Sequence, residues 1–256
     1  MSQPFPVAPT GIPYITTAQM REVDRAMIDD FGITLLQMME NAGRNLADVV
    51  IHTVLDGEPH GRRVVVAAGP GGNGGGGLVA ARHLHNRGCE VSVVLAAQED
   101  RVSDAVRHQL TILQKSGVMI ESGEQSETGE ISKSLDEADV VIDALFGYSL
   151  NKSPRGAAAS MVRVMNESTT PVVSNDIPSG IDATTGTIYE PAVRATATLT
   201  IALPKTGLRS SRARQLAGDL YLGDIAVPPE LYEAALGMPA PKLFTTSHIV
   251  KIPGPD

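Results

Sequence analysis

Tryptophan is absent from this sequence of 256 residues, aromatic residues make up 4% of it, and Cys89 is its one cysteine. So few aromatic rings offer little surface on which nucleic-acid bases could stack. No disulfide can form within the chain. Cys89 lies between an apolar helical stretch and an apolar strand, so we expect it to be a small buried hydrophobic residue.

Clustered positive charge and long apolar runs are also missing. The net charge is −8, and the 21 Lys and Arg residues form no basic run, which argues against a nucleic-acid surface. No stretch reaches the ~18 consecutive apolar residues of a membrane span. The N-terminus has neither the basic nor the apolar region of a signal peptide. We therefore expect a soluble cytoplasmic protein without nucleic-acid or membrane partners.

Short, continuous apolar runs separated by helical stretches dominate the sequence from Val64 onward. Runs of this kind are typical of strands that are covered on both faces, as in a parallel sheet. The alternation predicts an α/β fold, a three-layer α/β/α Rossmann-like domain with a mostly parallel, doubly wound sheet. The strands are expected at residues 64–68, 91–96, 118–121, 140–144, 172–175 and 197–203, with a possible last strand at 219–226.

Helices are expected between these strands and ahead of the first one. Thr16 and Thr34 each stand three residues before a glutamine, the capping-box pattern of a helix N-terminus. The first helix should end near Phe31, and the second carries a wide apolar stripe. Further helices are expected at residues 78–87, 102–116, 132–137, 157–166 and 228–236.

The domain organisation follows from length and composition. We expect one domain over residues 14–237, preceded by a Pro-rich N-terminal arm (residues 1–13). It is followed by a C-terminal tail (residues 238–256) that contains four prolines. The tail has few anchoring residues, and the sequence leaves its order open.

The stretch from Gly69 to Gly77 contains seven glycines around Asn73. We interpret it as a loop almost without side chains, followed by a helix from Leu78. A glycine-rich loop loses much backbone entropy on folding. A ligand that lies on backbone N–H groups at a helix N-terminus, such as phosphate, would compensate for this loss. The stretch therefore predicts a nucleotide site.

Three ionisable residues follow expected strands, at the edge where open α/β sheets bind ligands. Asp143 ends one strand, where its role could equally be to cap a turn. Asp176 ends another, ahead of a turn made rigid by Pro178 and Gly180. A carboxylate held in this way suits general-base catalysis. Lys205 follows a third strand and is expected to be a solvated charge rather than a catalytic one.

A dehydrogenase site and a zinc site are both poorly supported. The glycine stretch matches the dinucleotide pattern G-x-G-x-x-G, but Glu99 comes late for the acidic residue that holds the ribose. Hydride transfer also leaves the extra glycines and the turn after Asp176 unexplained. His83 and His85 make no metal-ligand spacing with a third group, so we predict no zinc.

Four motifs, in this order, resemble the YjeF N-terminal domain family of NAD(P)H-hydrate epimerases. They are LQMMENAG from Leu36, the stretch from Gly69 to Gly77, VIDALFG from Val141, and NDIPSG from Asn175. The resemblance runs from about residue 15 to 227. It implies a Rossmann-like homodimer that interconverts the R and S forms of NAD(P)HX, the nicotinamide cofactor hydrated at C6 of its ring. A separate dehydratase would then repair one form.

The resemblance also implies a set of site residues. Asp176 is expected to meet the reacting ring as the catalytic base. A potassium ion is expected at Asn73, Asp143 and Ser179. Either Lys152 or Lys205 is expected to supply a proton or bind phosphate. The substrate-binding residues are expected to be Gly72, Asn73, Gly74, Gly75, Gly76, Gly147, Tyr148, Ser149, Leu150, Asn151, Lys152, Ser153 and Asp176.

Two positions depart from the family pattern Gly-Asn-Asn-Gly-Gly-Asp-Gly. Gly72 replaces the first asparagine, and Gly76 replaces the aspartate. The loss of this carboxylate would remove a charged hydrogen bond, worth ~1–3 kcal/mol of affinity. The departure keeps an alternative open, a non-catalytic nucleotide- or partner-binding module on the same fold. An NAD(P)-dependent dehydrogenase is the third hypothesis.

Overall fold

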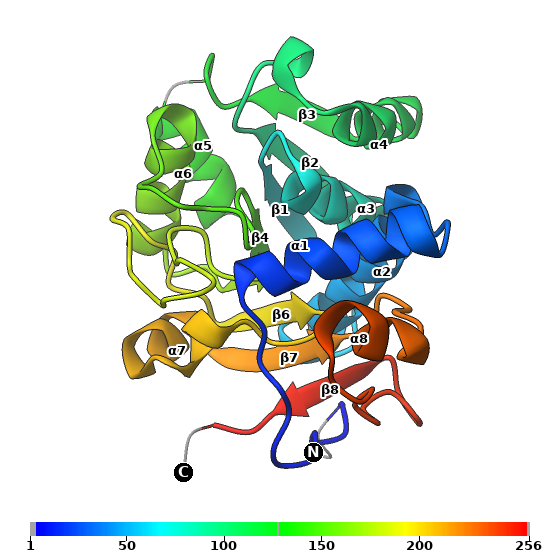
Figure 1. The fold of residues 1–256 in the computed structure, drawn as a ribbon. Coiled ribbons are helices and arrows are strands. Elements are labelled where there is room, and N and C mark those ends of the chain that lie inside the picture. The colour runs from blue at the N-terminus through cyan, green and yellow to red at the C-terminus, as the bar shows by residue number, and fades with distance from the viewer. Residues whose placement is uncertain (1–3, 127, 255–256) are drawn as a thin grey trace.

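Continuous apolar runs form the strands of the central sheet because both faces of that sheet are covered by helices (Figure 1). The computed structural model describes residues 4–126 and 128–254. Residues 1–3 of the expected arm and 255–256 of the expected tail lie outside the described residues. Within the described ranges, none of the helices is long and apolar enough to cross a membrane.

The sheet contains eight strands in the described part of the chain, in the order β3-β2-β1-β4-β5-β6-β7-β8. The first seven run parallel, and β8 pairs antiparallel with β7. The strands are β1 (Arg63–Ala68), β2 (Glu90–Leu95), β3 (Met119–Ser122), β4 (Val140–Ala144), β5 (Val172–Asn175), β6 (Ala197–Ile201), β7 (Asp219–Gly223) and β8 (Ile249–Ile252). The predicted α/β fold class and its mostly parallel, doubly wound sheet are confirmed.

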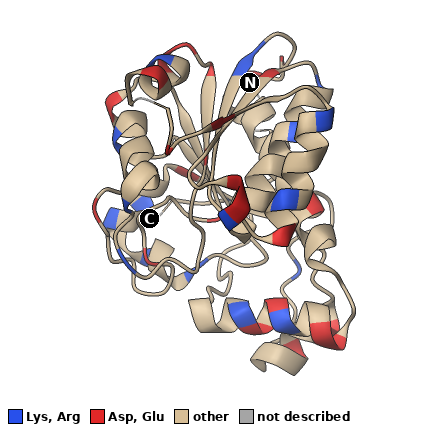
Figure 2. Cartoon of the chain, turned by 90° about the horizontal axis from the view of Figure 1, so that it is seen from above, with Lys and Arg blue, Asp and Glu red and all other residues tan. Residues whose placement is uncertain are grey.

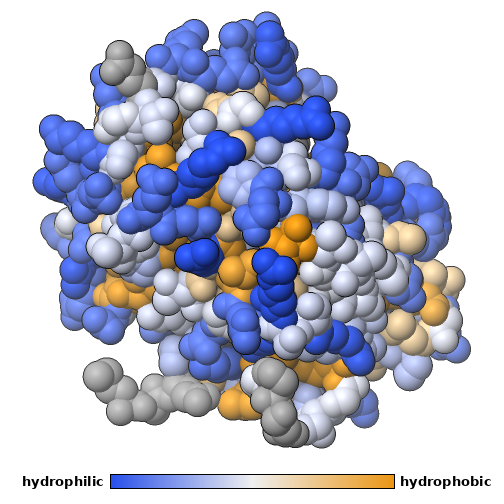
Figure 3. All heavy atoms as spheres, turned by 90° about the vertical axis from the view of Figure 1, so that its left-hand side faces the viewer, coloured by the Kyte–Doolittle hydropathy of each residue, from blue (hydrophilic) through white to orange (hydrophobic). Residues whose placement is uncertain are grey.

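Eight α-helices surround this sheet in the described ranges. They are α1 (Thr17–Arg25), α2 (Leu35–Thr53), α3 (Gly72–Asn86), α4 (Asp104–Lys115), α5 (Thr128–Asp136), α6 (Gly156–Glu167), α7 (Ser211–Ala217) and α8 (Pro229–Leu236). Shorter turns are the π-helical Ala26–Asp30 and the 3-10 segments Glu99–Arg101 and Thr206–Arg209. Positively and negatively charged residues are scattered over the helices and loops (Figure 2). The face seen in Figure 3 is mostly hydrophilic, with smaller apolar patches between the polar side chains.

The two predicted capping boxes are present. The Thr16 hydroxyl accepts a hydrogen bond from the Gln19 backbone, and the Gln19 side chain accepts one from the Thr16 backbone in return. Thr34 and Gln37 repeat this arrangement at α2. These reciprocal bonds satisfy backbone donors that would otherwise be unpaired at a helix start. The first helix continues from Arg25 into the π-helical turn before Gly32.

The glycine stretch departs from its prediction, because α3 begins at Gly72 rather than at Leu78. Close packing explains why so many glycines stand in a helix. A Cβ on Gly77 would lie 2.4 Å from the Cβ of Ala144 in β4, and one on Gly74 would lie 1.9 Å from the Gly69 carbonyl oxygen. The missing side chains let the first turns of α3 lie almost directly on the sheet. The predicted loop is therefore wrong from Gly72 onward, and only Gly69 to Gly71 lie outside the helix.

The two ends of the chain pack together beside β7. In the tail, β8 extends the sheet, and Lys251 in β8 exchanges backbone hydrogen bonds with Pro6 and Ala8 of the arm, both 2.8 Å long. Phe5 is 8% exposed and meets the Tyr221 ring edge-on, with 5.6 Å between ring centroids. The arm thus covers part of β7 and β8. The tail, whose order the sequence left open, contributes β8 to the sheet.

Candidate active site

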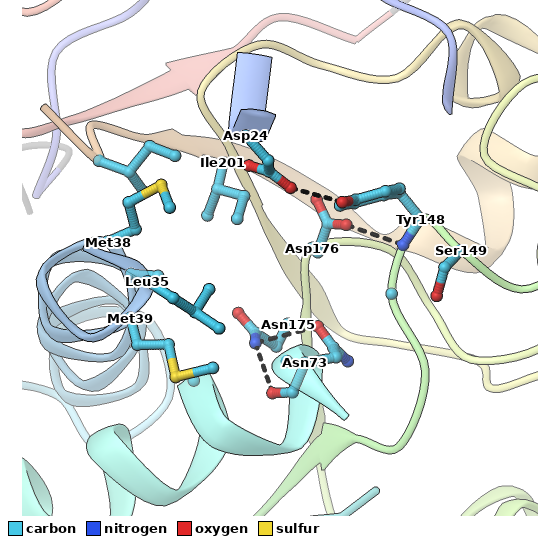
Figure 4. Close-up of a pocket in the computed structure, with 15 residues that line it drawn as sticks. Asp24, Leu35, Met38, Met39, Asn73, Tyr148, Ser149, Asn175, Asp176 and Ile201 are labelled. Atoms are coloured by element: carbon cyan, nitrogen blue, oxygen red, sulfur yellow. Dashed lines mark hydrogen bonds between the residues drawn. The ribbon is translucent and has the colours of Figure 1, made fainter. Parts of the chain in front are cut away.

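A cavity of about 180 Å³ opens at the carboxyl ends of β5 and β6, beside the first turn of α3 (Figure 4). This is the edge at which open parallel sheets bind ligands. Apolar side chains of α2 line one side, and polar groups of α1, β5 and the loop after β4 line the other. The lining residues are Asp24, Leu35, Met38, Met39, Ala42, Gly72, Asn73, Gly76, Gly147, Tyr148, Ser149, Asn175, Asp176, Ile201 and Ile225.

Asp176 is held rigidly at the tip of β5. Its backbone has φ = 66°, a left-handed conformation in which a non-glycine residue is uncommon. The carboxylate is 2% exposed and accepts a 3.0 Å hydrogen bond from the Tyr148 backbone N–H. Beyond it, Gly180 has φ = 106° and is packed against Ala192. The structure places Asp176 at the cavity, at the start of the turn that the sequence indicated.

Lys205 is the cationic partner of Asp176. Its Nζ lies 2.6 Å from Asp176 Oδ1 and donates a 2.8 Å hydrogen bond to the Ile201 carbonyl oxygen. The side chain is fully buried, so the expectation of a solvated charge is wrong. A lysine can be buried here because the carboxylate compensates its charge and the carbonyl takes one of its protons.

Asp143 and Ser179 are in direct contact beneath the cavity. The Ser179 hydroxyl donates a 2.6 Å hydrogen bond to Asp143 Oδ1, and Ser174 donates a 2.8 Å bond to Oδ2. Asp143 is fully buried, and this burial raises the pKa of its carboxyl. The groups that oppose the rise in pKa are hydroxyls and backbone amides rather than a cationic side chain.

Asn73 lies in the first turn of α3, on the cavity wall. Its side-chain oxygen accepts a 3.1 Å hydrogen bond from Asn175 Nδ2, and a Cβ on Gly147 would come within 3.0 Å of the same oxygen. The Asn73 Nδ2 atom is buried and has no partner within residues 4–126 and 128–254. Asn73 therefore lies against Asn175 and Gly147. Ser179 contacts the loop after β4 at a different residue, because the Phe146 backbone N–H donates a 2.9 Å hydrogen bond to the Ser179 hydroxyl.

The expected substrate-binding residues divide into two groups. Gly72, Asn73, Gly76, Gly147, Tyr148, Ser149 and Asp176 line the cavity. Gly74 and Gly75 are buried in helix packing, Leu150 is half-buried, and Asn151, Lys152 and Ser153 are exposed beyond the cavity lining. Of the two candidate lysines, the structure brings Lys205 to Asp176 and leaves Lys152 at the surface.

Sequence reasoning missed Asp24 and Asn175 as cavity residues. The Tyr148 hydroxyl donates a hydrogen bond to Asp24 Oδ2 on one wall of the cavity, and burial raises the pKa of the Asp24 carboxyl. One signal for Asp24 was available. With helical spacing it falls on the same stripe as the buried Met20 and Met27, where an acidic residue is unusual. Asn175 gave no such signal, because a polar residue at a strand end is common.

The fold and the cavity together define a Rossmann-like α/β protein with a ligand site at the carboxyl edge of its sheet. A family profile described as YjeF-related protein N-terminus matches residues 35–207. The chain therefore belongs to the family of YjeF-related N-terminal domains. A crystal structure of the yeast protein ynu0 (YNL200c) is similar, with a TM-score of 0.80 and 26% identity over 94% of this chain and 100% of that one.

Two relatives that carry functional names have a higher sequence identity to this chain. An NAD(P)H-hydrate epimerase of Dehalogenimonas lykanthroporepellens is 44% identical over 86% of this chain and 85% of its own length. A bifunctional NAD(P)H-hydrate repair enzyme Nnr of Moorella thermoacetica is 37% identical over 85% of this chain. The match covers 41% of that bifunctional protein.

Proposed function

We propose that this protein is an NAD(P)H-hydrate epimerase, an isomerase that interconverts the R and S forms of NAD(P)HX in the repair of nicotinamide nucleotides. The observation that carries the proposal is Asp176, a buried carboxylate that is paired with Lys205 and lines the cavity. Relatives that carry the epimerase name at up to 44% identity support the same activity.

Asp176 is the proposed base. In NAD(P)HX the hydroxylated C6 is bonded to the ring nitrogen, so a base that removes the hydroxyl proton lets the C6–N bond break. The electron pair of that bond goes to nitrogen, which takes up a proton, and C6 becomes an aldehyde. Closure on the opposite face of the aldehyde reverses these transfers and inverts C6. The route needs a base and a proton donor, and no redox partner.

The proton donor is proposed to be Asp24, a carboxyl whose pKa is raised by burial and which a hydrogen bond from the Tyr148 hydroxyl holds in place. Their hydrogen bond lies on the same wall of the cavity as Asp176 (Figure 4). Lys205 lies behind Asp176 and is outside the cavity lining. Its proposed role is to pair with the carboxylate and hold it in place. Lys152, the other candidate, is exposed and is not assigned a role in proton transfer.

A potassium ion is proposed at Asn73, Asp143 and Ser179. A carboxylate, a hydroxyl and an amide are the oxygen donors that suit a hard cation. Within the described residues, Asp143 is buried without a cationic side chain to balance it, and this carboxylate supports a site for a cation. Asn73 would hold the ion through its Oδ1 atom, which now accepts a hydrogen bond from Asn175. When bound, potassium would offset negative charge beside the substrate phosphates.

The protein is also proposed to be a homodimer that works beside a separate dehydratase in the cytoplasm. Exposed apolar side chains near the start of α2 support a subunit contact. Of the six large hydrophobic residues exposed in the described chain, four lie between residues 28 and 36: Ile28, Phe31, Leu35 and Leu36. Sedimentation equilibrium tests this contact, because Phe31→Glu should shift a dimer towards monomer.

The test of function is the R/S interconversion of purified NADHX, followed by chromatography. The parent protein should equilibrate the two forms, and Asp176→Asn should not. Should the parent protein leave both forms unchanged while binding the nucleotide, the epimerase proposal would fail in favour of a binding module.

A further inference from the structure

Asn175 carries a buried hydrogen-bond acceptor that no group in the described part of the chain uses. The residue is 3% exposed, it lines the cavity, and its Oδ1 atom has no partner among the described residues. Figure 4 shows this oxygen pointing away from Asn73 into the space between the α2 side chains and Asp176. A buried acceptor without a partner costs free energy, and a ligand that donates a hydrogen bond would remove this cost.

The orientation of the Asn175 amide is fixed by its neighbour. Its Nδ2 atom donates to the backbone oxygen and to the side-chain oxygen of Asn73, both at 3.1 Å. A flipped amide would place Oδ1 against the Asn73 backbone oxygen, which can only accept. The acceptor is therefore held towards the cavity before any ligand arrives.

Gly76 makes this arrangement possible. A Cβ at position 76 would lie 2.8 Å from Asn175 Nδ2, which is closer than real Cβ contacts. The absence of a side chain in α3 at this position thus leaves room for an amide from β5.

We propose that Asn175 Oδ1 accepts a hydrogen bond from the carboxamide N–H2 group of the nicotinamide ring. This inference rests on the proposed function. Asp176 takes the C6 hydroxyl, and phosphates offer no donor at neutral pH, so the carboxamide is the remaining donor on the ring. It stands at C3, across the ring from C6. The apolar wall of Leu35, Met38 and Met39 suits the ring between these two polar contacts.

An analogue that lacks this one donor provides the test. Reduced 3-acetylpyridine adenine dinucleotide has a methyl group in place of the carboxamide amino group. The wild-type protein should epimerise the hydrate of NADH with a kcat/KM about ten- to a hundredfold higher than the corresponding hydrate of the analogue, as expected for one unpaired buried acceptor. Most of the difference should lie in KM. Asn175→Ala should bring the ratio close to one.

Two further variants separate this role from a general effect on the cavity. Gly76→Ala should lower the ratio although residue 175 is unchanged, because the added Cβ displaces its amide. Met38→Ala is the matched control on the apolar wall, because Met38 is buried and lies outside the proposed subunit contact. It should weaken both substrates alike and leave the ratio at the wild-type value. Circular dichroism checks that each variant is folded.

Equal kcat/KM for both hydrates in the wild type, or an unchanged ratio in Asn175→Ala, would overturn the inference. The inference is also overturned if Asn175→Ala changes only the potassium concentration that gives half-maximal activity, because Asn175 would then act at the ion. If the wild type epimerises neither hydrate, the proposed function fails separately. Kd values for NADH and its acetylpyridine analogue, measured by calorimetry, then decide the inference. The wild type should bind NADH about ten- to a hundredfold more tightly than the analogue, and Asn175→Ala should bind both about equally.

Discussion

At the scale of single residues, the ion pair between Asp176 and Lys205 links catalysis to stability. Asp176→Asn should lower the epimerisation rate about 10²- to 10⁴-fold because the proposed base is lost. It should also lower the free energy of unfolding by about 3–5 kcal/mol, because Lys205 then keeps a buried charge without a partner. Urea denaturation and R/S interconversion measure the two effects.

A second substitution tests the cause of this instability. Lys205→Met in the Asp176→Asn background removes the unpaired charge and should restore part of the lost stability, but not the activity. Asp219→Asn is the surface control, because its partner Lys251 and its own carboxylate are both partly exposed. It should cost less than about 1 kcal/mol. Additive effects of the Asp176 and Lys205 substitutions would contradict the coupling.

The buried Asp24 carboxyl should make the stability of the fold depend on pH. Burial raises the pKa of this carboxyl in the folded protein above 3.8, although the hydrogen bond from Tyr148 opposes the rise. As the pH rises above 3.8, the unfolded chain ionises at this residue first, so ionisation favours unfolding. Asp24→Asn should therefore raise the melting temperature at pH 7, and the gain should shrink as the pH falls towards 4. A gain that grows at acid pH would contradict this reading.

At the scale of elements, the glycines of α3 differ in what a side chain would meet. A Cβ on Gly75 would lie 2.7 Å from the terminal methyl of Met39, which is flexible, whereas one on Gly77 would meet Ala144 in the sheet. Alanine favours a helix over glycine by about 0.8–1 kcal/mol. Gly75→Ala should therefore be close to neutral, and Gly77→Ala should cost about 1–3 kcal/mol through overpacking. Thermal unfolding of the two variants checks the order, and a reversed order would contradict the packing argument.

The contrast between β4 and α3 shows which elements can be predicted from the sequence. β4 was predicted to the residue because its run of apolar side chains is buried on both faces, so local pattern and tertiary environment agree. The start of α3 was missed because glycine disfavours a helix locally, and the contact with Ala144 that requires it comes from a strand about 70 residues away. Packing decided the structure against local propensity.

The same limit applies to the site. Asp176 could be identified because a strand, a carboxylate and a rigid turn are adjacent in the sequence. Its partner Lys205 and the Asp24–Tyr148 bond join residues that are distant in sequence, and no local pattern announces such pairs. Lys205, which follows β6, can be buried because Asp176, which follows β5, carries the opposite charge.

At the scale of the whole molecule, the two ends of the chain complete one edge of the sheet. β8 covers the edge that β7 would otherwise leave open, and the arm forms a bridge to it at Val7 and Lys251. Figure 1 shows the N-terminal and C-terminal segments side by side at this edge. An uncovered strand edge invites pairing with other chains, so these terminal segments protect the sheet as well as extend it.

This role predicts that a single side chain of the arm contributes to global stability. Phe5 is 8% exposed and contacts Tyr221 and His52, whereas Val7, two residues away, is 55% exposed. Phe5→Ala should lower the free energy of unfolding by about 3 kcal/mol, because a buried ring leaves a cavity between the arm and β7. Val7→Ala, in the same segment, should change it by less than about 0.5 kcal/mol. If both variants unfold like the parent protein in urea, the arm is only an appendage and the sheet edge is stable without it.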